Sequence, residues 1–189
     1  MPPAGCSRTA PAPDGLPHRA YRPADSARTQ NENEKMAMPQ ITIYTDGSAL
    51  GNPGPGGYGC VLLSGPHRKE LSQGYRLTTN NRMELMAVCV ALETLRFEGS
   101  DVTIYSDSKY VVDAIEKRWL FGWEKKGFAG KKNPDLWQRF LRVYRRHRVR
   151  FVWVKGHAET VENNRCDQLA VAAANDRARL LEDCGYRPE

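Results

Sequence analysis

The sequence predicts an α/β protein built on a five-stranded mixed sheet, with three antiparallel strands and a parallel centre, flanked by helices. Three segments with strand periodicity follow one another before residue 79, separated only by short stretches of turn residues, which favours an antiparallel meander. Two further strand-like segments alternate with amphipathic helical segments, which favours parallel strands joined by crossover helices. The 189 residues, 40% of them hydrophobic, suffice for one domain with a core.

The strands are recognised by alternating β-branched residues and by the turn residues between them. They are predicted at 41–46, 58–63, 71–78, 101–106 and 149–154. Glycine and proline dominate residues 51–57, which predicts a sharp turn between the first two strands.

The helices are recognised by apolar residues three and four positions apart and by capping residues at their starts. They are predicted from 79–81 to about 97, at 108–115, from 134 to about 146, and from Asn163 or Asn164 onward. Gly99 is expected to end the first of them. Residues 117–133 are predicted to be irregular and basic, and 156–163 to form a polar loop.

Composition divides the chain into three parts. Residues 1–38 are rich in Pro, Ala, Arg, Ser and Asn without apolar periodicity, so they cannot bury enough surface to offset the entropy of ordering. We therefore predict a disordered extension at 1–38, a folded domain at 39–180 and a tail at 181–189. No apolar run is long enough to cross a membrane, and no secretory signal is present.

The five cysteines are odd in number and scattered, with no CxxC pair, which is typical of a reducing, cytosolic protein without a zinc site. The basic charge is concentrated in one segment. Residues 117–150 contain 12 Lys and Arg against two acids, a local charge of +10 in a chain whose net charge is +6. This excess points to a polyanionic partner, although a solvated helix face is the simpler alternative.

Four carboxylates stand near the ends of predicted elements. They are Asp46 in the first strand, Glu84 in the first turn of the first helix, Asp107 after the fourth strand, and Asp167 in the first turn of the last helix. Each alone could be a turn, capping or helix-dipole residue. In an open sheet, however, these points can converge at one crevice near the strand ends.

Clustered carboxylates at ~4 Å repel by roughly 4 kcal/mol per pair at an effective dielectric constant of about 20, so a cluster implies bound cations. Donors that are all oxygens suit Mg²⁺ or Mn²⁺ rather than zinc.

Seven blocks carry a resemblance to ribonuclease H type 1, of the bacterial single-domain kind. They read YTDGS from Tyr44, GNPGPGG from Gly51, TTNNRMELM from Thr78, DSKYV from Asp107, DLW from Asp135, WVKGH from Trp153 and ENNRCD from Glu162. The blocks occur in the family's order and cover about 41–175, and the implied ribonuclease H-like fold is the mixed sheet predicted above.

The resemblance implies an endonuclease that hydrolyses the RNA strand of RNA–DNA hybrids and leaves 5′-phosphate and 3′-hydroxyl ends. Its four acids would hold two Mg²⁺ ions, for which Mn²⁺ can substitute, and His157 would assist proton transfer or product release. The expected substrate contacts are Asn52, Thr79, Asn80, Asn81, Lys109, Trp119, Trp123, Lys125 and Lys126. Of these, Thr79 matches a DNA-phosphate site of the family. We expect residues 39–180 to be the catalytic domain of a cytoplasmic monomer that recognises the hybrid by shape and by its 2′-hydroxyls.

The chain departs from the family pattern in three places. The basic protrusion between Trp123 and Trp137 is short, residues 159–161 read Glu-Thr-Val instead of Gly-His-Pro, and Lys109 stands where a neutral polar residue is common. Three other functions also stay open: another nuclease of this fold, such as an integrase-like or Holliday-junction enzyme, a non-catalytic hybrid-binding module, or a domain of a reverse transcriptase. The two tryptophans at 119 and 123 could serve core packing instead of substrate binding.

Overall fold

The structure is a computed structural model that describes residues 38–155 and 161–188. The predicted extension, apart from Met38, lies outside the described residues, and so does His157. All the described residues belong to one unit, Met38–Glu189.

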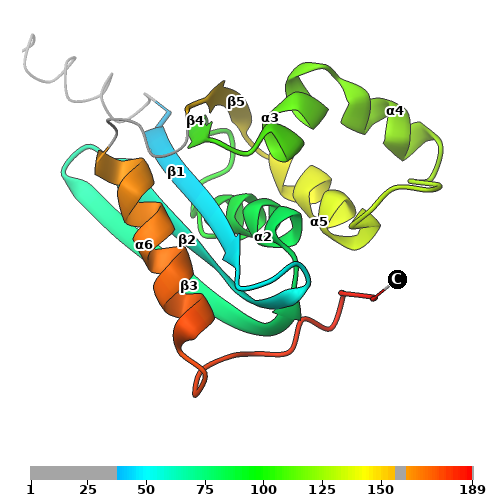
Figure 1. The fold of residues 1–189 in the computed structure, drawn as a ribbon. Helices are drawn as coiled ribbons and strands as arrows, with labels where there is room; N and C mark the ends of the chain where they lie inside the picture. The colour runs from blue at the N-terminus through cyan, green and yellow to red at the C-terminus, as the bar shows by residue number, and fades with distance from the viewer. Residues whose placement is uncertain (1–37, 156–160, 189) are drawn as a thin grey trace, which may run out of the picture. The chain divides into compact units, whose positions relative to one another are not determined.

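Five strands form one mixed sheet (Figure 1). They are β1 (Gln40–Ala49), β2 (Gly54–Ser64), β3 (His67–Thr78), β4 (Asp101–Ser106) and β5 (Arg148–Trp153). Their order in the sheet is β3-β2-β1-β4-β5. Strand β2 pairs antiparallel with β1 and β3, whereas β4 pairs parallel with β1 and β5. The predicted fold class is confirmed.

The described helices are α2 (Asn80–Glu93), α3 (Lys109–Glu116), α4 (Trp119–Lys125), α5 (Pro134–Tyr144) and α6 (Val161–Asn175). Figure 1 shows α6 along one side of the antiparallel strands and α2 on the other side. Two glycines explain how closely these helices approach. A Cβ atom on Gly47 would collide with the α2 backbone at Glu84, and one on Gly59 would collide with the α6 carbonyl of Cys166. Each helix therefore packs directly on sheet backbone.

The core lies between the sheet and the helices α2, α3 and α5. Its largest fully buried apolar side chains include Trp137, Phe140, Ile43, Leu85 and Ile104. The buried face of α5 contains Leu136, Trp137, Phe140, Leu141 and Val143. Trp137 is buried with its Nε1 donating to the hydroxyl of Tyr110 at 2.9 Å, so the indole is satisfied inside the core.

The predicted turn at 51–57 is too long. Strand β2 begins at Gly54, so the connection from β1 occupies only 50–53, where the amide of Leu50 donates to the carbonyl of Pro55 at 2.7 Å. The glycines at 54, 56 and 57 extend the strand because their missing side chains leave room for neighbouring backbone and for α6. Strand β3 likewise begins earlier than predicted, at His67.

The first predicted helix ends earlier than expected. It stops at Glu93, not near Phe97, and the hydroxyl of Thr94 bonds back to the carbonyl of Val90 at 2.8 Å. Gly99, at φ +75°, donates to the carbonyl of Arg146 at 2.7 Å and thereby belongs to the turn into β4. The apolar residues at 95–97 that suggested a longer helix belong to this connection.

The prediction that residues 117–133 are irregular is wrong, because α4 occupies Trp119–Lys125. Two apolar anchors hold the segment to the core, since Leu120 is fully buried and Phe128 is 5% exposed. Arg118, at φ 60°, is the N-cap residue of α4 and separates this helix from α3.

The last helix begins earlier than predicted, so neither Asn163 nor Asn164 is its cap. Both lie in the first turn of α6, and Asn163 is buried. The buried positions Asn163, Cys166 and Ala170 are spaced three and four residues apart, so the helical face continues through this polar run.

The segment after α6 is bound to the sheet. The amide of Leu181 donates to the carbonyl of Gly74 at 2.9 Å, and the amide of Arg76 donates to the carbonyl of Leu181 at 2.9 Å. The predicted boundaries of the extension, the domain and the tail remain predictions. Among the described helices, none combines the length and the apolar character that a bilayer span requires.

Candidate active site

Asp46 projects from the middle of the sheet. It lies in β1, and the next residue, Gly47, faces α2, so the alternation of a strand directs Asp46 to the face covered by α6. Its antiparallel partner in β2 is Gly59, the residue on which α6 packs. The carboxylate accepts a hydrogen bond from the amide of Gly47 at 2.7 Å. Because Asp46 lies inside β1 on the face that α6 covers, we do not interpret it as a turn-capping residue.

Asp107 follows β4 directly and lies beside the strand that carries Asp46, because Thr45 is paired with Ser106. The expectation that Asp107 could cap the next helix is wrong. Ser108 is the N-cap of α3, and its hydroxyl accepts from the amide of Val111 at 3.3 Å. The Asp107 carboxylate is therefore not used in a cap.

Glu84 is the fifth residue of α2 and lies beyond its first turn, so the helix-dipole and capping-box readings fail. Its side chain accepts a hydrogen bond from the Ser108 hydroxyl. Burial, together with the charge of Asp107, raises the pKa of Glu84 to about 7, and the hydrogen bond from the Ser108 hydroxyl opposes the increase.

Asp167 is the seventh residue of α6, so its predicted place in the first turn is wrong as well. It is half-buried, and it follows Cys166, whose carbonyl lies against Gly59. Because Gly59 is paired with Asp46, this contact places Asp167 on the same face of the sheet as Asp46.

The pKa of Asp46 shows that the four acids form one electrostatic cluster. Burial and the negative charges of Asp107, Asp167 and Glu84 together raise this pKa to about 8, while the Gly47 amide opposes the increase. Four elements distant in sequence thus bring four carboxylates into mutual repulsion.

The donor set fits a hard divalent cation. All four donors are carboxylates, and their repulsion is what a bound cation would relieve. Within 38–155 and 161–188, no three Asp, Glu, His or Cys side chains are arranged so that they alone would hold a metal ion. The acids therefore interact as a cluster without forming a closed coordination cage.

Two expected substrate residues connect the β1–β2 loop to the start of α2. The side-chain oxygen of Asn80 accepts from the amide of Ala49 at 2.6 Å, and that of Asn52 accepts from the amide of Asn80 at 3.2 Å. Thr79 is the N-cap residue of α2 without a side-chain capping bond, and Asn81 is exposed. These bonds fix Asn52 and Asn80. Asn52, Thr79 and Asn81 line one groove of about 760 Å³.

The basic segment presents its charges beside partly buried aromatic rings. Lys125 and Lys126 are exposed at the end of α4, and Trp119 is 48% exposed. Trp123 packs edge-to-face on Trp137, with ring centroids 5.8 Å apart. Trp119 is thus available to a ligand, whereas Trp123 contributes mainly to packing.

Sequence reasoning missed two residues that position the acids. One is Ser108, which bonds Glu84, and the other is Trp153, whose Nε1 donates to the carbonyl of Asp107 at 3.1 Å. Lys109 lies with its ammonium 5.1 Å from the Trp153 ring centroid, beside Asp107. Ser108 lies in the DSKYV block and Trp153 begins the WVKGH block, so the sequence signal that could have identified both residues is these blocks. His157 lies outside the described residues, between Lys155 and Val161.

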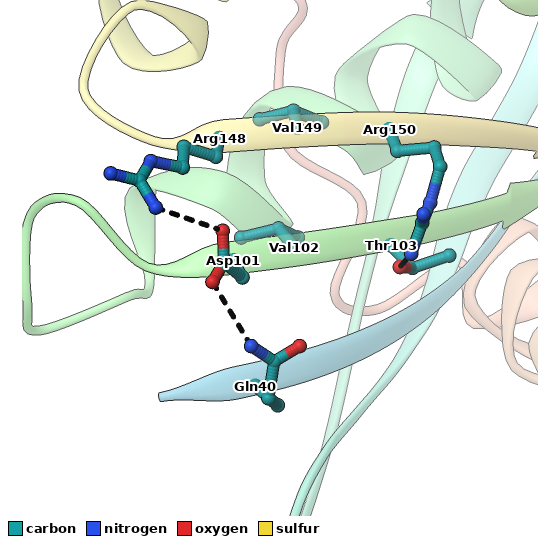
Figure 2. A pocket seen from close by; sticks show the side chains of 7 residues that line it. All are labelled: Gln40, Asp101, Val102, Thr103, Arg148, Val149 and Arg150. Carbon is teal, nitrogen blue, oxygen red and sulfur yellow. Dashed lines mark hydrogen bonds and ion pairs between the residues drawn. The ribbon is translucent and has the colours of Figure 1, made fainter. Parts of the chain in front are cut away.

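A second hollow, of about 370 Å³, lies at the opposite end of the parallel strands (Figure 2). Its acid, Asp101, accepts from Gln40 at 3.0 Å and faces Arg148 at 3.8 Å. Asp101 begins β4 and Asp107 follows it, so the two acids are about 20 Å apart at ~3.3 Å per residue. This hollow is separate from the acidic cluster.

The comparisons with known proteins agree on one family. A family model for RNase H matches residues 38–175 of the chain. The chain is 57% identical over 149 residues to Ribonuclease H of Desulforamulus reducens, covering 76% of this chain and 93% of that protein. It is also 57% identical over 157 residues to Ribonuclease H of Syntrophus aciditrophicus, covering 80% and 90% of the two chains.

Solved structures show the same fold. The structure of LC9-RNase H1, described as a type 1 RNase H with the type 2 active-site motif, has a TM-score of 0.68 and 30% identity, covering 79% of this chain and 80% of that one. LC11-RNase H1, solved in complex with an RNA/DNA hybrid, has a TM-score of 0.55 and 28% identity, covering 71% of this chain and 96% of that one.

Proposed function

The chain belongs to the ribonuclease H family, and on this premise we propose that it hydrolyses the RNA strand of RNA–DNA hybrids at the cluster formed by Asp46, Glu84, Asp107 and Asp167. The products would carry 5′-phosphate and 3′-hydroxyl ends. The observation that carries the proposal is the pKa of Asp46, which its three acidic neighbours and burial raise to about 8. Such mutual repulsion is typical of a site built for cations and not for fold stability.

Magnesium is the cation that we propose, with two ions per site and manganese as a substitute, because the donors are hard oxygens. When bound, the ions would activate water and stabilise the leaving 3′-oxygen at the scissile phosphate. The four carboxylates would hold these ions.

The residues around the acids would keep them in position. Trp153 fixes the backbone of Asp107, and the Ser108 hydroxyl holds the Glu84 side chain. The amide of Gly47 directs one oxygen of Asp46, which leaves the other free for a ligand. We propose that His157, next to this site in the family pattern, moves the proton or assists product release.

Hybrid recognition would use the groove edge and the basic segment. Asn52, Thr79, Asn80 and Asn81 would contact sugar and phosphate groups, because amides and hydroxyls read a duplex by shape and by 2′-hydroxyls. Exposed lysines at 125 and 126, together with Lys109, Trp119 and Trp123, would bind the phosphate backbone and stack on sugars. We further propose a cytoplasmic enzyme that acts as a monomer.

The experiment is incubation of the full chain with an RNA–DNA hybrid labelled on either strand, in Mg²⁺ and in EDTA. We expect cleavage of the RNA strand in Mg²⁺ alone, with the DNA strand intact. Cleavage of plain DNA duplexes or four-way junctions would favour another nuclease of this fold. Binding of the hybrid without any cleavage in Mg²⁺ or Mn²⁺ would favour a non-catalytic module.

A further inference from the structure

We propose that the carboxy-terminal tail, residues 185–188, lines the nucleic-acid groove and that Arg187 contacts a phosphate of the DNA strand. The groove of about 760 Å³ is lined by four segments: the β1–β2 loop with Asn52, the start of α2 with Thr79, the basic loop with Lys131, and the tail with Arg187. This inference rests on the proposed function, because Thr79 and its neighbours are the proposed hybrid contacts.

A buried ion cluster fixes the tail. Arg82 is 2% exposed and directs its guanidinium at two carboxylates. Its Nε and Nη2 donate to Asp183 at 2.7 and 2.9 Å, and its Nη1 and Nη2 donate to Asp135 at 2.9 and 2.7 Å. The Thr78 hydroxyl donates to Asp183 at 3.0 Å. Bidentate bonds of this kind hold the start of the tail in one geometry.

Gly185, the first residue of the tail, has no room to move inward. A Cβ atom on Gly185 would lie 2.6 Å from Nη2 of Arg82 and would collide with Oδ2 of Asp135. The amide of Tyr186 donates to the carbonyl of Asp183 at 3.0 Å, which turns the chain toward the groove. The placement of 185–188 therefore follows from the cluster beneath it.

Charge identifies what the tail binds. Arg82 pairs with two carboxylates, those of Asp135 and Asp183, so this cluster has a net charge of −1 and adds no positive charge to the groove. Arg187 donates only to two carbonyls, those of Cys184 at 2.8 Å and Tyr186 at 3.1 Å, and no carboxylate of the described residues pairs with it. Its positive charge remains available to an anion, and the anion that a hybrid offers is a backbone phosphate.

The strand follows from the neighbours of Arg187. Thr79 lines the same groove and stands at the position where the family resemblance implies a DNA phosphate. An arginine across the groove from this threonine would add a second donor to the same stretch of DNA backbone. We therefore assign Arg187 to the DNA strand and not to the RNA strand.

The test compares Arg187→Glu with Arg177→Glu, an equal charge reversal at an exposed turn residue that does not line the groove. Cleavage of a labelled hybrid is measured over a range of KCl concentrations. Arg187→Glu should raise KM several-fold and leave kcat and Tm unchanged. The slope of log KM against log KCl concentration should fall by roughly 0.9. Arg177→Glu should match the wild type.

A second measurement assigns the strand. Hybrids with one methylphosphonate linkage at successive positions of the DNA strand should include a position that weakens the wild type but leaves Arg187→Glu unaffected. Deletion of 187–189 should reproduce the Arg187→Glu result, which guards against misfolding of one variant. If the wild type cleaves the hybrid while Arg187→Glu and the deletion behave like Arg177→Glu, the tail inference fails and the proposed function stands. If the wild type cleaves no hybrid, the proposed function fails.

Discussion

Asp46 is the residue at which fold stability and proposed activity conflict most directly. Burial and three neighbouring acids raise its pKa from 3.8 to about 8, so the folded state favours the neutral carboxyl. A carboxyl with a raised folded-state pKa contributes stability at low pH, and this contribution is lost as pH rises through the folded-state value. Without metal, the folded protein should therefore lose stability as pH rises from 3.8 to about 8.

Asp46→Asn tests this conflict, because the amide keeps the shape and removes the charge. Activity should fall by several orders of magnitude. In EDTA the variant should melt higher than the wild type, and its advantage should grow from about pH 5 to about pH 8, reaching on the order of 1 kcal/mol or more. Thermal melts across this range, with and without Mg²⁺, measure both effects. An active variant, or one that melts lower in EDTA, would contradict the proposed role.

Ser108 has two tasks, since its hydroxyl caps α3 and donates to Glu84. Ser108→Ala should lower the free energy of unfolding by about 1 kcal/mol through loss of the cap. It should also raise the pKa of Glu84 further above about 7, because the hydroxyl opposes that increase. The acidic limb of the kcat/KM profile should then move to higher pH. Ser108→Thr, which keeps a hydroxyl, is the control, and an unmoved limb would leave Ser108 with the capping role alone.

The four acids could be named from the sequence, whereas the contacts that hold them could not. Asp46 and Asp107 stand in recognisable blocks, but the bond from Ser108 to Glu84 joins residues 24 positions apart and depends on how α2 meets β4. The first-turn positions assigned to Glu84 and Asp167 were wrong, because polar residues with weak helical signal preceded each acid inside its helix. Local patterns place residues on elements but do not fix where an element begins.

At the scale of elements, sheet glycines decide how helices pack. Gly59, inside the strand predicted at 58–63, lies in β2 against the α6 backbone. Gly59→Ala should lower the free energy of unfolding by about 1–3 kcal/mol, because α6 would have to move outward.

Gly122→Ala is the matched comparison for this prediction. Gly122 lies in α4 with no atom within 4 Å of an added Cβ, so alanine should stabilise the helix by about 0.5–1 kcal/mol. Chemical denaturation measures both changes. Equal effects of the two substitutions would show that helix approach does not require glycine at position 59.

Helix α4 is the element that sequence patterns did not predict. Basic residues on both sides of α4 dominated the pattern of the segment, and the burial of the segment rests on Leu120 and on Phe128 beyond the end of the helix. The same segment carries the proposed phosphate contacts, so its charge can be tested separately from its fold. Lys125 and Lys126 are exposed at its end.

Reversal of both lysines to Glu should raise KM for the hybrid and lower the log–log salt slope by roughly 0.9 per lost phosphate contact, with kcat nearly unchanged. The control is the equal reversal of Lys69 and Arg177, which are exposed elsewhere on the fold. Steady-state kinetics at several KCl concentrations give both quantities. An unchanged slope would identify the two lysines as a solvated face.

For the described unit as a whole, the charges and the acids have a consistent arrangement. The acids converge where β1, β4, α2 and α6 meet, whereas exposed lysines gather at the end of α4 and in the loop after it. A duplex bound to the basic segment would thus present its backbone to the acids. We expect selection to rest on duplex shape and sugar chemistry and not on base sequence.

This arrangement predicts which duplexes are cut. A hybrid whose RNA strand contains a run of deoxynucleotides should be cleaved only outside that run, because the 2′-hydroxyls that Asn52 and Asn81 would contact are missing there. Duplex DNA should not be cut, and four consecutive ribonucleotides within a DNA strand should restore cleavage at that site. Cleavage mapping on denaturing gels, with base sequence permuted as the control, measures this. Because the contacts reach sugars and not bases, permutation should change rates only modestly, and efficient cutting of all-DNA duplexes would show that the groove does not read the 2′-hydroxyl.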